Sequence, residues 1–213
     1  MEYFSNSDGG IIVYNMIKVI QDNKQYLSDI DGLIGDGDHG INMNKGFTMC
    51  RDELDKNSGN LSQNLKVLSR ILMADIGGSM GPLYGMFFKA LAKGCSEKDS
   101  IDAGLFSEML SAGEKAIKDI GNAEVGDKTL LDCLVPAVDA FRKSLDHGKS
   151  FIEALEALKK AAEEGRDSTK DMVAKVGRSS RLGERSRGVL DAGATSCCIL
   201  LHSMADSIIS LIQ

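Results

Sequence analysis

The chain has 213 residues, enough to bury a substantial hydrophobic core, and we expect one domain over residues 1–213. With 2 prolines, 10 methionines and 5% aromatic residues, the composition favours helices over sheets. The net charge of -6 argues against a nucleic-acid-binding protein, whose binding face usually carries a surplus of basic residues.

The sequence also bears on compartment. The N-terminus is polar and acidic, unlike a signal peptide. The most apolar stretch, residues 196–212, is short and contains His202 and Asp206, so we expect a buried helix and no membrane span. The five cysteines show no C-x-x-C spacing, which is typical of reduced thiols. We therefore expect a cytoplasmic protein, and with three histidines a zinc site is disfavoured.

Helical spacing of apolar residues predicts an all-α protein of eight helices. They are expected at residues 8–29, 40–55, 61–76, from 83 through 91, 103–120, 130–145, 151–175, and from 191 to the C-terminus. Glycine-rich loops follow the first, third, fifth and seventh of them, near Gly35, Gly77, Gly121 and residues 177–193. In an antiparallel up-and-down arrangement, loops after odd-numbered helices lie at the same end. The four loops are therefore predicted to form one composite site.

The first of these loops is acidic. Asp31, Asp36 and Asp38 fall within eight residues and are interleaved with glycines. Clustered carboxylates repel one another unless a cation or solvent screens them, and their oxygen donors suit hard ions such as magnesium, calcium or manganese. A solvated turn with an aspartate N-cap is the alternative, but three aspartates favour metal binding.

Two familiar loop motifs do not fit this stretch. Gly35, Gly37 and Gly40 match the dinucleotide-binding G-x-G-x-x-G, but the aspartates would face the phosphates directly and no β-branched strand precedes them. An EF-hand loop starting at Asp36 would have Gly40 at its fifth position and Phe47 at its last, where a glutamate is expected.

The other loops offer groups that bind anions. The Gly77-Gly78-Ser79-Met80-Gly81-Pro82 segment opens onto a helix, whose free N–H groups and dipole attract anions. Close helix packing would explain its glycines equally well, but the expected convergence of the loops favours anion binding. Residues 165–188 carry seven basic and three acidic side chains, and their latter part is expected to be a mobile, phosphate-binding loop or a solvated basic loop.

Helix capping explains three further residues. Asp127 and Thr129 lie at capping distance of the helix expected from residue 130, and Asp191 is the natural N-cap of the last helix. Together, carboxylates for a divalent ion, N–H groups for phosphates and an arginine loop to cover them are the requirements of phosphoryl transfer.

Four motifs follow one another across nearly the whole chain: Asp31-x4-Asp36-x-Asp38-His39-Gly40 with the following Asn42-Met43-Asn44, Gly77-Gly78-Ser79-x-Gly81-Pro82-Leu83-Tyr84-Gly85, Gly126-Asp127-Lys128-Thr129, and Gly177-Arg178-x-Ser180-x-Leu182-Gly183-Glu184-Arg185-Ser186 with Asp191-x-Gly193-Ala194-Thr195-Ser196. In this order they resemble the nucleotide-binding L subunit of dihydroxyacetone kinases.

The resemblance implies an eight-helix antiparallel barrel that binds Mg²⁺, with two ions expected, and ADP or ATP at one end. Asp31, Asp36 and Asp38 match the metal ligands, and Arg178 would neutralise charge developing during transfer as its loop closes. The positions that match nucleotide contacts are His39, Gly40, Ile41, Asn42, Ser79, Met80, Gly121, Leu130, Arg178, Asp191, Ala192 and Gly193.

The resemblance also implies partners: a K subunit that holds dihydroxyacetone, and a phosphotransferase-system M subunit that rephosphorylates a retained nucleotide. A transcriptional regulator and a second copy of the chain remain possible partners, and neither a membrane nor nucleic acid is expected. The chain departs from the family at Met80, Arg181 and Ala192. A related short keto sugar is therefore an alternative acceptor, and a regulatory Mg-ADP-binding protein or a helical protein with a structural calcium turn are alternative functions.

Overall fold

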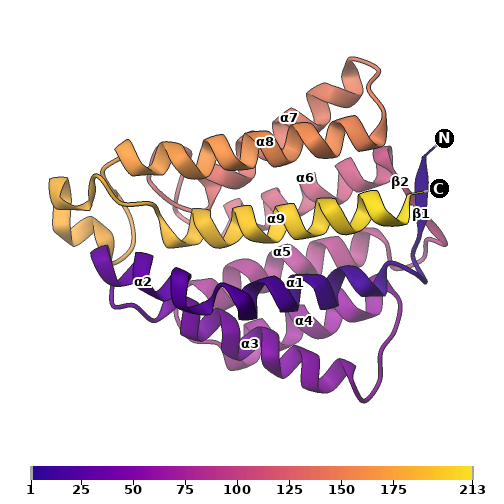
Figure 1. The fold of residues 1–213 in the computed structure, drawn as a ribbon, viewed down its shortest axis with the longest axis horizontal. Helices are drawn as coiled ribbons and strands as arrows, with labels where there is room; N and C mark the ends of the chain where they lie inside the picture. The colour runs from indigo at the N-terminus through magenta and orange to yellow at the C-terminus, as the bar shows by residue number, and fades with distance from the viewer. Residues whose placement is uncertain (1, 213) are drawn as a thin grey trace.

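The computed structural model describes residues 2–212 and is almost entirely helical, which confirms the all-α class (Figure 1). The α-helices are α1 (Gly10–Asp22), α2 (Lys24–Ile34), α3 (His39–Leu54), α4 (Leu61–Asp75), α5 (Met80–Gly94), α6 (Ala103–Ile120), α7 (Leu131–Asp146), α8 (Phe151–Ser168) and α9 (Ala192–Leu211). Two 3-10 helices, η1 (Thr169–Asp171) and η2 (Ser179–Ser186), and two strands, β1 (Tyr3–Ser5) and β2 (Ser100–Asp102), complete the described elements.

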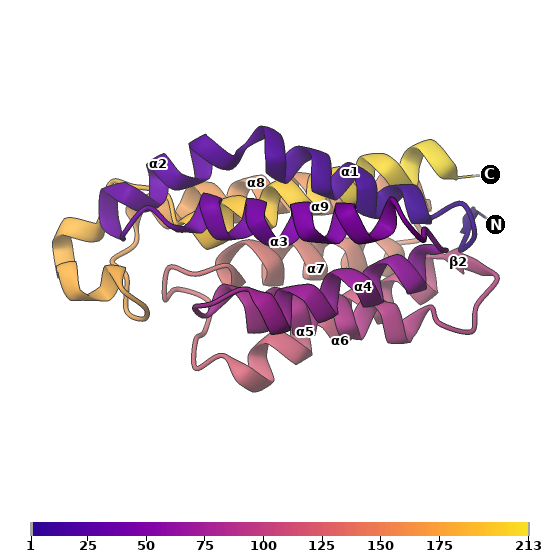
Figure 2. The ribbon, with the colours of Figure 1, turned by 90° about the horizontal axis from the view of Figure 1, so that it is seen from below.

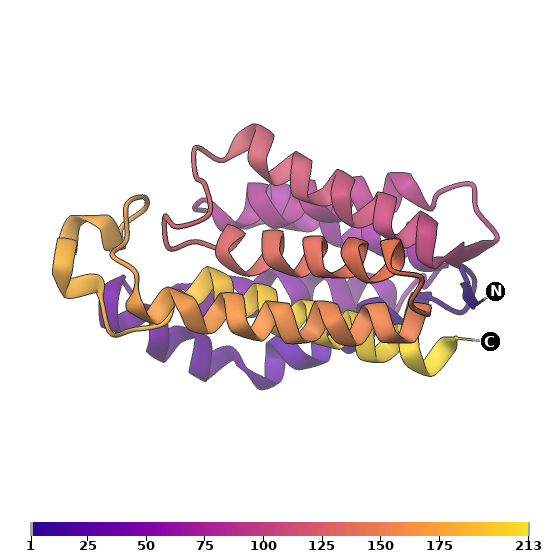
Figure 3. The ribbon, with the colours of Figure 1, turned by 90° about the horizontal axis from the view of Figure 1, so that it is seen from above.

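The long helices run along the long axis of the molecule (Figures 1 and 2). Each α-helix contacts the next one in the chain, as α7 and α8 show in Figure 3, and the first helix also contacts the last. The two termini and the antiparallel pair β1 and β2 lie at one end, and α2 and η2 lie at the other. The second end carries the glycine-rich loops.

The first predicted helix is divided in two, which corrects the expected span of residues 8–29. At Asn23 the side-chain Nδ2 donates to the Val19 carbonyl oxygen (2.8 Å), which the Asn23 backbone N–H also contacts (3.1 Å). An asparagine side chain that competes with the backbone in this way interrupts a helix. Helix α2 then starts at Lys24 and extends to Ile34, so Asp31 lies in its last turn.

Two other helix boundaries differ from the prediction. Helix α5 starts at Met80 and not at residue 83, because Pro82 falls in the first turn, where its missing N–H costs no hydrogen bond. Helix α8 ends at Ser168 and not near residue 175. Beyond it the chain turns so that the Met172 carbonyl oxygen reaches the Lys128 ammonium.

Helix α9 lies in the core, in contact with α1, α7 and α8. It is the one helix within residues 2–212 that is long and apolar enough to cross a membrane, and 61% of that stretch is buried inside the protein. Burial among other helices is typical of a core helix. All five cysteines are free and buried, as predicted for reduced thiols.

Candidate functional site

A cavity of about 400 Å³ opens at the end of the molecule that carries the glycine-rich loops. Residues of all four loops line it, including Gly35, Gly77, Gly121 and Gly177. These positions are far apart in the sequence, and the antiparallel course of the helices brings them together. The predicted convergence of the four loops is confirmed.

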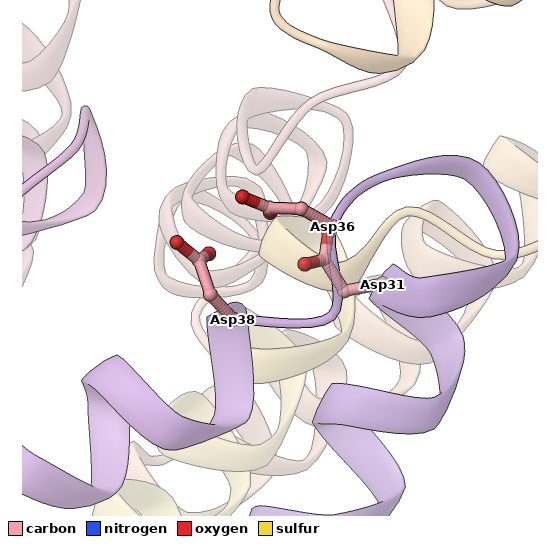
Figure 4. A group of neighbouring side chains, drawn as sticks. All are labelled: Asp31, Asp36 and Asp38. Atoms are coloured by element: carbon pink, nitrogen blue, oxygen red, sulfur yellow. The ribbon is translucent and has the colours of Figure 1, made fainter.

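Three aspartates lie on one wall of this cavity (Figure 4). Asp31 comes from the last turn of α2, Asp36 from the following loop and Asp38 from the residue before α3. One carboxylate oxygen of each lies within 4.8 Å of the others. The donor set is all oxygen, which fits a hard divalent cation such as Mg²⁺.

Glycines make this arrangement possible. A Cβ at Gly35 would lie 2.5 Å from Asp31 Oδ1, so only glycine leaves room for that carboxylate. Gly37 adopts a left-handed φ of 76°, which turns the chain back towards α3. A Cβ at Gly40 would lie 2.0 Å from the Lys24 carbonyl oxygen. Gly40 therefore allows α3 to start directly against α2.

Arg178 supplies positive charge to this wall. Its guanidinium forms an ion pair with Asp36 and lies 3.8 Å from an oxygen of Asp38, although its side chain is 58% exposed. We call the segment that carries Arg178, residues 172–189, the arginine segment. It reaches across the cavity to the carboxylates, as the sequence predicted. Because these contacts are exposed to solvent, the ion pairs themselves contribute little to stability.

Four helices begin at the cavity: α3, α5, α7 and α9, represented in its lining by His39, Met80, Leu131 and Ala192. The first turn of each helix has N–H groups without a partner in the helix and carries partial positive charge. Asp191 caps α9, as predicted, by accepting from the Ala194 N–H (2.7 Å). Next to a carboxylate wall, this arrangement suits an anion that carries its own divalent cation.

A buried polar chain lies beneath the starts of α3 and α9. His39 Nε2 is 2.9 Å from Ser196 Oγ, which is 2.7 Å from the Tyr84 hydroxyl. Burial lowers the pKa of His39 to about 4, against the opposing effect of the nearby Asp31 carboxylate. His39 is therefore uncharged at neutral pH and orients its ring through Ser196.

The turn before α7 is built differently from the prediction. Asp127 does not cap α7; it accepts from the Glu124 N–H (2.8 Å) and pairs with Lys175. Thr129 Oγ1 does accept from the Leu131 N–H (3.2 Å). The main acceptor is the buried Asp132, whose two carboxylate oxygens receive the N–H groups of Gly126 and Thr129.

The arginine segment is more ordered than a simple loop. It contains η2, and buried Ser186 ties it down by accepting from the Ala174 N–H (2.9 Å) and donating to the Gly183 carbonyl oxygen (2.7 Å). The Gly188 N–H also donates to the Lys170 carbonyl oxygen (2.7 Å). The base of the segment is therefore fixed to the rest of the protein.

Most of the sequence-predicted site residues line the cavity: Asp31, Asp36, Asp38, His39, Asn42, Ser79, Met80, Gly121, Leu130, Arg178, Asp191, Ala192 and Gly193. Gly40 and Ile41 are not among its lining residues. Gly40 serves the contact between α2 and α3, and the Ile41 side chain is 53% exposed.

Sequence reasoning did not assign Tyr84, Lys128, Asp132 or Ser196, which lie in or behind the cavity wall. Tyr84, Lys128 and Ser196 do fall inside the motifs singled out above. The sequence motifs therefore included these three residues, but the sequence did not reveal their hydrogen-bond partners.

The fold and the site together define an all-α protein with one end suited to a divalent cation and an anion. The family model described as the DAK2 domain matches residues 33–206, and the chain belongs to this family.

Its relatives agree with that family. The chain is 38% identical over 191 residues to the PEP-dependent dihydroxyacetone kinase, ADP-binding subunit DhaL of Escherichia coli (strain K12), covering 88% of this chain and 90% of that protein. It is 39% identical over 188 residues to the PTS-dependent dihydroxyacetone kinase, ADP-binding subunit DhaL of Lactococcus lactis subsp. lactis (strain IL1403), covering 88% and 90%. The crystal structure of the dihydroxyacetone kinase from C. freundii in complex with AMP-PNP and Mg²⁺ shares the fold, with a TM-score of 0.70 and 24% identity over 93% of this chain and 33% of that one.

Proposed function

We propose that this protein binds Mg²⁺ with ADP or ATP in the cavity and is the nucleotide-carrying subunit of a multicomponent dihydroxyacetone kinase. The observation that carries the proposal is the meeting of three carboxylates and four helix N-termini in one cavity. Two relatives that match nearly end to end are named as ADP-binding subunits of such kinases. The cavity volume of about 400 Å³ lies within the usual range for small-ligand pockets.

Different residues of the cavity bind the metal ions and the phosphates in this proposal. Asp31, Asp36 and Asp38 hold Mg²⁺, and their six carboxylate oxygens are enough to share between two ions. The phosphates lie against the first turns of α3, α5 and α9, at the other positions matched to nucleotide contacts. The bound metal neutralises phosphate charge, so that an anion can approach an acidic wall.

Arg178 acts on the transferred group. A guanidinium beside the carboxylates stabilises the charge that spreads over the phosphoryl oxygens in the transition state. Its contacts with Asp36 and Asp38 support this role, because they place the guanidinium beside the carboxylates at which the metal-bound phosphates are expected. His39, Asn42 and the glycines of the other loops bind and orient the nucleotide.

The protein works with partners in this proposal. A K subunit holds dihydroxyacetone, and an M subunit of the phosphotransferase system restores the phosphate on a nucleotide that stays bound, in the cytoplasm. The names of the two relatives, PEP-dependent and PTS-dependent, support this donor. The fold is proposed to be a single-domain, eight-helix barrel in which α1 and α2 count as one interrupted helix, supported by the contact between α1 and α9.

Calorimetry of ADP binding with and without Mg²⁺ tests the proposal. The parent protein should bind ADP only with the metal, and Asp36→Asn should weaken binding at least about tenfold, because the phosphates lose part of their countercharge. Asp52→Asn, which removes an exposed carboxylate from the far half of α3, is the matched control and should bind like the parent. Equal affinities for parent and Asp36→Asn would contradict the metal assignment.

The transfer step needs a separate assay. Phosphate should pass to dihydroxyacetone when the protein is mixed with K and M subunits of a relative, a PEP source and the general phosphotransferase proteins. Bound Mg-ADP without turnover in that mixture would refute the kinase role and leave nucleotide binding intact.

A further inference from the structure

Lys128 is a buried ammonium group at the centre of a hydrogen-bonded junction. Its side chain is 1% exposed. Its Nζ donates to the carbonyl oxygens of Met172 (3.2 Å), Ser186 (2.5 Å) and Val189 (2.6 Å). A buried charge is tolerated only with such partners, so this junction is strongly specified.

The three contacts use up the donors of the group. A lysine ammonium has three N–H donors and no acceptor. Although Lys128 lies in the cavity wall, all its donors point to backbone carbonyls, and none is left for a phosphate oxygen. Its effect on the site must therefore pass through the segment that it holds.

That segment carries Arg178. Met172 follows η1, Ser186 ends η2 and Val189 lies just before α9, so the contacts hold both ends of residues 172–189. Lys128 itself lies in the turn before α7, where the next residue, Thr129, donates its N–H to Asp132. The Lys128 backbone adopts a left-handed φ of 64°. Non-glycine residues rarely adopt this conformation unless the surroundings enforce it.

We propose that Lys128 is a positioning residue that clamps both ends of residues 172–189 to the turn before α7, and so presents Arg178 to Asp36 and Asp38. The link to phosphoryl transfer rests on the proposed function, whereas the clamp itself does not. If Lys128 only stabilised the core, substituting it would lower the free energy of unfolding without specifically loosening residues 172–189.

Digestion by an arginine-specific protease tests the clamp without ligand. Lys128→Met keeps the aliphatic stem and removes the ammonium. We expect about tenfold faster cleavage after Arg178, Arg181, Arg185 and Arg187, because the segment opens locally more often. Lys175→Met is the matched control, since it removes an exposed lysine of the same region that pairs with Asp127, and it should be cleaved within about twofold of the parent rate.

If Lys128→Met fails to fold, Lys128→Gln replaces it, because an amide still donates two hydrogen bonds. Its cleavage should be faster than that of the parent. Parent-like cleavage in the folded variant, or equal acceleration in Lys175→Met, would overturn the clamp.

A double-mutant cycle with Arg178→Ala then tests positioning in the transfer assay. Lys128→Met should lower kcat at least about tenfold and change Mg-ADP affinity by less than about threefold. In the Arg178→Ala background the same substitution should lower kcat by less than about twofold, since its effect passes through Arg178. Losses that multiply in full would overturn positioning. If the parent shows no transfer, the proposed function fails, and protease digestion still decides whether Lys128 clamps the segment.

Discussion

At the scale of single residues, the site depends on positions where no side chain fits. Gly40 shows this most clearly, because the start of α3 lies against the backbone of α2 there. A Cβ at Gly40 would meet the Lys24 carbonyl oxygen at 2.0 Å and Ser28 Oγ at 2.6 Å. The family resemblance matches this residue to a nucleotide contact, and the structure shows in addition that Gly40 packs against the backbone of α2.

We expect Gly40→Ala to lower the free energy of unfolding by at least about 2 kcal/mol, because two helix backbones must separate. Gly32→Ala is the matched control in α2, since its nearest neighbour is 3.9 Å from the added Cβ. It should stabilise the protein by up to about 1 kcal/mol through higher helix propensity. Urea unfolding measures both, and equal effects of the two substitutions would contradict the packing role.

The same scale separates what a single sequence can predict from what it cannot. Asp31, Asp36 and Asp38 were predictable as a metal site because they are close in the sequence, so their mutual repulsion follows from the sequence alone. The contacts of Lys128 were not, because its partners lie 44 to 61 residues away. The hydrogen bond between Tyr84 and Ser196 was not predictable for the same reason, since these residues are 112 positions apart in the chain.

At the scale of elements, the N-termini of helices contribute much of the cavity wall, and Asp191 at the start of α9 is an example. Its carboxylate caps α9 at the cavity wall. Burial raises its pKa to about 7, although the hydrogen bond from the Ala194 N–H opposes this shift. The folded protein therefore keeps a proton there that the unfolded chain releases near pH 4.

Asp191 should thus make the metal-free protein less stable as pH rises from about 4 to about 7, because the folded state binds more protons than the unfolded state in that window. Asp191→Asn keeps a capping side chain and removes the charge, so this contribution should vanish. Urea unfolding of both proteins in EDTA at pH 5 and pH 8 measures it. A difference between them that is independent of pH would contradict the shift.

Element boundaries show the limit of patterns along the chain. The eight predicted helical stretches all contain helices, but Asn23 interrupts the first and the chain leaves α8 at Ser168. Both departures come from hydrogen bonds rather than from apolar spacing. The short pair of β1 and β2 escaped prediction, because three-residue strands carry almost no periodic signal.

At the scale of the whole molecule, the cavity and the capping box of α8 lie at opposite ends. The termini, β1, β2 and the start of α8 lie at one end and α2 at the other (Figure 1). The cavity lies at the end of α2, because its lining includes Asp31 and Ile34. At the first end Ser150 forms a capping box: its Oγ accepts from the Glu153 N–H (3.1 Å), and the Glu153 carboxylate accepts from the Ser150 N–H (2.8 Å).

Ser150→Ala should therefore lower the free energy of unfolding by about 1 kcal/mol and leave Mg-ADP affinity unchanged. Thermal unfolding and calorimetry on the same preparation measure the two quantities. A loss of affinity would show that the two ends are coupled.

The sequence by itself determined the helical class, the approximate helices and the acidic turn, because helical periodicity and charge repulsion act between residues close in the chain. Through helix parity it also predicted that the four glycine-rich loops meet. Only the tertiary structure decided which side chains face the cavity, that Gly40 and Ile41 do not line it, and that Lys128 holds both ends of the arginine segment. Those features depend on contacts between distant residues, whose geometry exists only once the helices have packed.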